Sequence, residues 1–188
     1  MLETNLTVRE IQTAIANTFN VRKNVFIPNV SWGYFKTHEA DLVSIQNHYL
    51  YEYEIKRSWS DFLADFKKDT THFEGKVFKF YYVVPKSIVD KCDEFLANYE
   101  WPEPYTKEHG WPYDKYPCGL LFYDEDPNEW VGTKTNAPEL ARYTNSTNKE
   151  YRLFLEEENA LMRLGCMRLW SKNALNENKQ DIKTDEEK

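Results

Sequence analysis

The chain is poor in cysteine, in glycine and in long apolar runs, and these shortages exclude several classes of protein. Its 188 residues include only three cysteines and six glycines. Three widely separated cysteines fit free thiols in a reducing compartment better than a disulfide framework. They also lack the short cysteine and histidine spacings of structural zinc sites, so we expect no structural zinc.

No stretch of the sequence approaches the ~20 consecutive apolar residues that a membrane-spanning helix needs. The first ten residues have neither the basic n-region nor the apolar h-region of a signal peptide. We therefore expect a protein with no membrane partner and a cytoplasmic location.

Positive charge is also in short supply, because 24 Lys and Arg face 31 Asp and Glu, a net charge of -7. Proteins that coat nucleic acid through bulk charge are usually basic, so any contact with nucleic acid must be local. Aromatic residues, in contrast, are abundant, with 11 Phe, 13 Tyr and 6 Trp, enough for a real core. The length predicts a single domain over residues 1–172, followed by a disordered polar tail over 173–188.

Hydrophobic periodicity predicts an alternation of helices and strands. The first helix begins behind a Thr7-x-x-Glu10 capping pattern, and another begins behind Ser58. This order predicts an α/β fold, a mixed sheet with helices on both faces. The expected elements are helix 8–19, strands 25–34, 40–46 and 50–57, a helix from 59 to 66, strand 77–85, helix 87–99, strands 119–126 and 129–135, and helix 149–170.

One strand carries charges where a core is expected. Alternation in strand 50–57 places Glu52, Glu54 and Lys56 on one face, and a hairpin brings Asp41 alongside Glu54. Two neighbouring carboxylates repel each other unless a cation lies between them, and oxygen ligands suit Mg²⁺ or Mn²⁺. Lys56 can then orient or deprotonate a water for attack on phosphorus. The pattern predicts a hydrolytic metal site.

Asp41 followed by Glu54-Ile55-Lys56 resembles the catalytic signature of the PD-(D/E)XK, or restriction-endonuclease-like, nuclease superfamily, although Ala40 stands where that signature has proline. The resemblance extends over about residues 8–170, and it is most similar to the MmcB-like DNA-repair proteins of that superfamily. The segments that carry it are EADLV (39–43), EIKRSWSDFLADFKK (54–68), FYYVVPKSI (80–88) and CGLLFYDED (118–126).

The resemblance implies a restriction-endonuclease-like core with helices and strands in the order α-β-β-β-α-β. It also implies a magnesium-dependent deoxyribonuclease that acts in DNA repair or processing. Asp41, Glu54 and the main-chain carbonyl of Ile55 would hold Mg²⁺ or Mn²⁺, and Lys56 would assist the attacking water.

Three further residues are candidates with two interpretations each. Some members of the superfamily add a carboxylate from a helix to the metal site, and Glu10 is a candidate for that role. The capping box with Thr7 explains Glu10 without a metal, and we prefer the cap. Lys67 and Lys68 are candidates for contact with a DNA phosphate, or they complement the dipole of the preceding helix. The charges of residues 54–69 sum to zero, so these lysines do not form a basic patch.

Two rival functions stay open from the sequence. The chain is alternatively a catalytically inactive nuclease fold that binds DNA or protein, which its net acidity favours. A third interpretation is a structural protein whose charged strand is an exposed sheet edge. The substrate, the choice between endonuclease and exonuclease, and the oligomeric state do not follow from the sequence.

Overall fold

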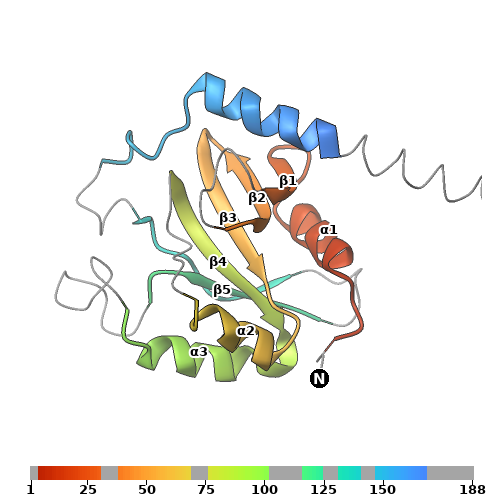
Figure 1. The fold of residues 1–188 in the computed structure, drawn as a ribbon, viewed down its shortest axis with the longest axis vertical. Helices are drawn as coiled ribbons and strands as arrows, with labels where there is room; N and C mark the ends of the chain where they lie inside the picture. Colours follow the sequence, from red (N-terminus) through yellow and green to blue (C-terminus); the bar gives the residue numbers. More distant parts are fainter. Residues whose placement is uncertain are drawn as a thin grey trace, which may run out of the picture.

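Six strands form one mixed sheet in the computed structural model of the protein (Figure 1). The structure describes residues 4–30, 38–68, 76–101, 116–124, 131–140 and 147–168. The strands lie in chain order, β1 to β6; β3, β4 and β5 are parallel, and the other pairings are antiparallel. Their bounds are β1 Val25–Val30, β2 Ala40–Gln46, β3 Tyr49–Ile55, β4 Val77–Pro85, β5 Gly119–Tyr123 and β6 Gly132–Thr135.

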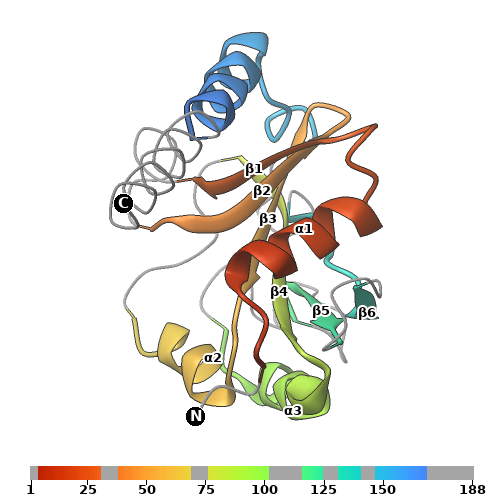
Figure 2. The same cartoon turned by 90° about the vertical axis from the view of Figure 1, so that its right-hand side faces the viewer.

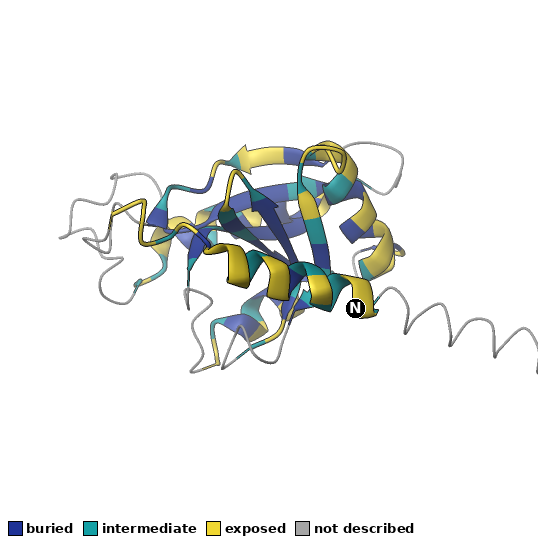
Figure 3. Cartoon of the chain, turned by 90° about the horizontal axis from the view of Figure 1, so that it is seen from above, coloured by how far each residue is buried: buried dark blue, intermediate teal, exposed yellow. Residues whose placement is uncertain are grey.

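Helices cover both faces of this sheet, as the sequence predicts (Figures 1 and 2). On one face α1 buries its apolar stripe against β2 to β5; on the other, α2, α3 and the helix at 155–168 pack on a second core. Figure 3 shows the central strands buried and the outward faces of the helices exposed. The helices are α1 Val8–Thr18, α2 Trp59–Asp65, the short 3₁₀ turn η1 Lys86–Ile88, α3 Val89–Asn98 and residues 155–168.

The capping box at the start of α1 is confirmed. The Thr7 hydroxyl accepts a hydrogen bond from the Glu10 main-chain N–H at 3.3 Å, and Glu10 Oε2 accepts one from the Thr7 N–H at 2.7 Å. Behind this cap, Ile11 and Ile15 are fully buried against the sheet. The cap therefore fixes where α1 begins and which of its faces meets the strands.

Replacing Thr7 with alanine is expected to lower the free energy of unfolding by ~1 kcal/mol, because the Glu10 main-chain N–H loses its capping acceptor and the Glu10 carboxylate loses the hydroxyl that donates to it. Urea unfolding monitored by circular dichroism measures this change. Thr13→Ala is the control, since the Thr13 hydroxyl only donates to the Arg9 carbonyl within the helix. Equal stability of wild type and Thr7→Ala would contradict the role of the cap.

A two-residue turn sets the register of β2 against β3. Asn47 and His48 both adopt positive φ angles, 51° and 69°, as the tight hairpin turn expected at this dipeptide requires. The pairing that follows places Leu42 opposite Tyr53. In this antiparallel register, the next pair of positions places Asp41 opposite Glu54.

The position of β3 rules out the exposed-edge interpretation. This strand pairs with β2 on one side and β4 on the other, so it is internal. The residues Glu54 and Lys56 are only 6% and 4% exposed. The charged face is therefore buried beneath α2, and the exposed edge that the third interpretation assumed is wrong.

The last helix begins later than its periodicity predicts, at residue 155 instead of 149. The Leu153 N–H donates to the His48 carbonyl at 2.8 Å, and Arg152 forms a bridge with Tyr49. Because this backbone pairs with the β2–β3 hairpin, it cannot also make helical hydrogen bonds.

The remaining differences concern the ends of two strands, and two predicted segments lie outside the described residues. β3 begins at Tyr49 and ends at Ile55, and β5 ends at Tyr123. The extension of the first strand beyond Val30 and the tail predicted at 173–188 lie outside the described residues. Within the described ranges, no helix is long and apolar enough to cross a membrane.

Candidate functional site

The predicted site residues meet where β3 ends and the chain turns into α2. The Ser58 hydroxyl caps α2 by accepting from the Asp61 N–H at 3.1 Å, and Phe62 anchors the helix in the core. This cap brings α2 directly over the last residues of β3. The side chains of Glu54 and Lys56 consequently point into the space between the sheet and the helix.

Asp41 is held at this point from both sides. Its Oδ2 accepts a hydrogen bond from the Ile55 N–H at 2.8 Å, and its carbonyl oxygen accepts one from Gln12 Nε2 of α1 at 2.7 Å. Gln12 is itself buried and also donates to Asn29 of β1. The structure thus places Asp41 beside the end of β3, as the hairpin predicts.

Lys56 is enclosed between two carboxylates. Its Nζ lies 2.8 Å from Glu54 Oε1 and 2.8 Å from Asp65 Oδ2, and Asp65 Oδ1 also accepts from Lys68 Nζ at 2.8 Å. Burial lowers the pKa of Lys56, but the charges and hydrogen bonds of Glu54 and Asp65 outweigh it, so the pKa is raised overall. Lys56 is therefore protonated at neutral pH. In that form its ammonium group donates hydrogen bonds and has no lone pair with which to accept a proton.

Excess negative charge marks the other half of the site. Burial, and after it the charge of Glu54, raises the pKa of Asp41 to about 7, against the opposing effects of the Ile55 N–H and Lys56. Two acidic groups that disfavour each other's ionised form are the arrangement that a bound cation would relieve. Their oxygens and the Ile55 carbonyl form a donor set that fits Mg²⁺ or Mn²⁺.

The raised pKa of Asp41 gives the Asp41→Asn variant a pH-dependent advantage in stability. Since the pKa of Asp41 is about 7 in the folded protein and 3.8 for an ordinary aspartate, the contribution of Asp41 to stability falls as pH rises between these values. We expect Asp41→Asn to exceed the wild type by on the order of a few kcal/mol at pH 8, and by much less at pH 4. An asparagine oxygen can still accept from the Ile55 N–H.

Urea unfolding at pH 4 and pH 8 without divalent cations measures this difference. Glu156→Gln is a matched control, because Glu156 is exposed on the last helix. A gap between Asp41→Asn and wild type that is the same at both pH values would contradict the raised pKa.

The remaining predicted residues lie outside this cluster or have other partners. Glu10 is engaged by Thr7, whose main-chain and hydroxyl hydrogen bonds lower the pKa of Glu10, so the capping interpretation holds. Lys68 pairs with Asp65, and Lys67 is exposed. Across the described segments, no group of three or more His, Cys, Asp or Glu residues forms a metal-binding cluster.

Two residues of the site had no role assigned from the sequence. Asp65 is the second partner of Lys56, and it stands in the S-x-x-D-F-x-x-D pattern of α2, where its spacing from the cap was a usable signal. Gln12 fixes the main chain of Asp41, and no local pattern marks it. The charged face also continues to Glu52, which is fully buried and lies 2.8 Å from His38 Nε2.

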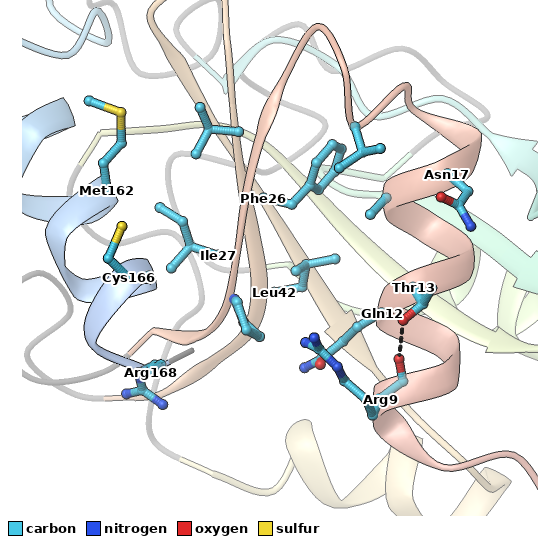
Figure 4. Close-up of a pocket in the computed structure, with 15 residues that line it drawn as sticks. Arg9, Gln12, Thr13, Asn17, Phe26, Ile27, Leu42, Met162, Cys166 and Arg168 are labelled. Atoms are coloured by element: carbon cyan, nitrogen blue, oxygen red, sulfur yellow. Dashed lines mark hydrogen bonds between the residues drawn. The ribbon is translucent and has the colours of Figure 1, made fainter. Parts of the chain in front are cut away.

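A groove of about 740 Å³ lies around the edge strand β1, between α1 and the helix at 155–168 (Figure 4). Its wall is mainly apolar and includes Phe26, Ile27 and Met162, while Arg9 and Gln12 lie toward one end. Gln12 connects this end of the groove to the carbonyl of Asp41.

Comparison with known proteins supports the fold alone. No family model matches the sequence, and no curated protein matches it. A solved structure, the SPO1766 protein of unknown function from Silicibacter pomeroyi, is similar with a TM-score of 0.55 and 14% identity. The match covers 93% of this chain and 95% of that one, so the mixed α/β arrangement is similar over nearly the whole length.

Proposed function

We propose that the protein hydrolyses phosphodiester bonds of DNA with Mg²⁺ or Mn²⁺, as a PD-(D/E)XK-type nuclease with a restriction-endonuclease-like core. The observation that carries the proposal is the meeting of Asp41, Glu54 and Lys56 at one end of an internal strand. Burying these charged groups is unfavourable for folding, because an apolar face would pack there without desolvating charges. A role in function would explain why the chain keeps them. The helix and strand order α-β-β-β-α-β adds support.

Each residue of the cluster has a distinct part in this proposal. Asp41, Glu54 and the Ile55 carbonyl would hold the cation, which when bound supplies Lewis-acid stabilisation of charge on the phosphate. Lys56, protonated and fixed by Asp65, would orient the attacking water through its ammonium N–H groups. Asp65 is a positioning residue, since it touches Lys56.

The direct test is cleavage of supercoiled plasmid, linear duplex, single-stranded and branched DNA by the purified protein with Mg²⁺ or Mn²⁺, and again with EDTA. Cleavage that needs the divalent cation supports the proposal. Equal cleavage by wild type, Glu54→Ala and Lys56→Ala would exclude this site as its source.

A second candidate is a nuclease fold that binds DNA or protein without catalysis. The enclosure of Lys56 by two carboxylates favours it, because that ammonium group is engaged before any substrate arrives. The net charge of -7 also weakens attraction to a polyanion. Calorimetric titration of Mn²⁺ separates the candidates: no binding, or binding that Asp41→Ala leaves unchanged, would favour the inactive module.

A further inference from the structure

Arg57 follows Lys56 in the chain, and its side-chain Nε has no hydrogen-bond acceptor among the described residues. The residue is half-buried, and its Nε is buried without a hydrogen bond. Its main chain is fixed, because the Arg57 N–H donates to Asp61 Oδ2 at 3.1 Å. Buried polar groups in proteins are nearly always hydrogen-bonded, so a guanidinium group left in this state calls for an explanation.

Glu10, the carboxylate whose charge interacts with Arg57, does not supply that acceptor. Alternation along the strand end directs Arg57 away from Lys56, toward the side of α1 and Glu10. The pKa of Glu10 is lowered chiefly by its hydrogen bonds with Thr7, and only weakly by the charge of Arg57. The Glu10 carboxylate therefore serves the helix cap, and the described residues give Arg57 no ion pair.

The neighbouring lysines differ from Arg57 in this respect. Lys56 and Lys68 both have Asp65 as a partner, so their charges are already compensated. Lys67 is exposed and lies beyond the opposite end of α2. Arg57 thus combines a charge that has no ion pair within the described segments with a position just after β3, one residue from the cluster.

We infer that Arg57 binds a backbone phosphate of the DNA strand that enters the candidate site. This inference rests on the proposed function. The contact between Arg57 and a phosphate would give a protein with a net charge of -7 a local point of attraction for DNA. A guanidinium group presents several N–H donors in a planar fork that matches phosphate oxygens. Turning toward a phosphate would also give the buried Nε–H an acceptor that it lacks in the present position.

The test is equilibrium binding of a fluorescein-labelled DNA duplex in EDTA, where no metal-dependent cleavage takes place, over a series of salt concentrations. Each neutralised phosphate contributes ~0.9 to the slope of log affinity against log salt. Arg57→Ala is therefore expected to reduce the slope by ~0.9, which amounts to roughly eightfold weaker binding for a tenfold difference in salt. Arg57→Lys, which keeps the charge, is expected to retain the slope.

Arg22→Ala is the matched control, because it removes the same charge from an exposed arginine in the turn after α1. It is expected to keep the wild-type slope. A slope that Arg57→Ala leaves unchanged, or a wild-type protein that does not bind the duplex, would overturn the inference. Thermal melting of all variants tests whether a reduced slope comes from the lost charge or from an unfolded protein.

Binding and cleavage give separable outcomes. A reduced slope in Arg57→Ala with no cleavage by the wild type would retain the phosphate contact and reject the nuclease. Cleavage by the wild type with an unchanged slope would retain the nuclease and reject the role of Arg57.

Discussion

Replacing Glu54 with glutamine is expected to lower the rate of metal-dependent DNA cleavage by roughly 10²–10³-fold. The reason is that a catalytic cation contributes several kcal/mol of charge stabilisation, and each 1.36 kcal/mol corresponds to about tenfold in rate. Glutamine has nearly the shape of glutamate but is a much weaker ligand. The substitution also removes the negative charge that, after burial, raises the pKa of Asp41.

The folded structure is expected to tolerate Glu54→Gln. Lys56 Nζ keeps its contact with Asp65 at 2.8 Å, and a glutamine oxygen can still accept from it. Folding and chemistry can therefore be measured independently in this variant.

Initial rates of plasmid nicking at saturating Mn²⁺, together with calorimetric Mn²⁺ binding, measure the effect. Glu156→Gln carries the same change at an exposed position and is expected to cleave and bind as the wild type does. Cleavage by Glu54→Gln at the wild-type rate, with unchanged Mn²⁺ affinity, would contradict a role for Glu54 in the site.

Local signals in the sequence predicted most of the framework. The Thr7 and Glu10 capping box locates α1, and the Asn47-His48 dipeptide locates the turn between β2 and β3. Because these are interactions between neighbours in the chain, they leave a recognisable pattern. Strand alternation then places Glu54 and Lys56 on one face without any knowledge of the rest of the fold.

The contacts that complete the site join residues far apart in the sequence. Asp65 reaches Lys56 only because α2 folds back over β3, and Gln12 reaches Asp41 across 29 positions. Likewise, pairing of Arg152 with Tyr49 overrides the helical periodicity of residues 149–154. Periodicity describes which face a residue lies on, whereas the partner on that face depends on tertiary packing.

The charge of Lys56 also depends on packing. The sequence identifies only Glu54 as a charged partner of Lys56 on the same strand face. That leaves open whether the lysine orients a water or removes a proton from it. The second carboxylate from α2 outweighs desolvation and raises the pKa of Lys56. In the proposed reaction, a protonated Lys56 would therefore orient the water and would not remove its proton.

Replacing Lys56 with alanine is expected to lower the free energy of unfolding by ~3–5 kcal/mol in the absence of DNA and metal. The side chains of Lys56, Glu54 and Asp65 are 4%, 8% and 1% exposed, so removing the lysine leaves two carboxylates buried without the ammonium group between them. Urea unfolding at pH 7 measures the change. Lys67→Ala, an exposed neighbour, is expected to stay within ~0.5 kcal/mol of the wild type.

A triple variant distinguishes lost charge compensation from lost packing. Lys56→Met combined with Glu54→Gln and Asp65→Asn removes the charges of Lys56 and of its two carboxylate partners while keeping similar volumes, and such replacements are often neutral or stabilising. We expect this variant to recover most of the stability that Lys56→Ala loses, and to show no cleavage. If the triple variant is as unstable as Lys56→Ala, packing of the lysine stem would be the cause. Recovery without activity would mean that the buried charges are retained for chemistry at the expense of stability.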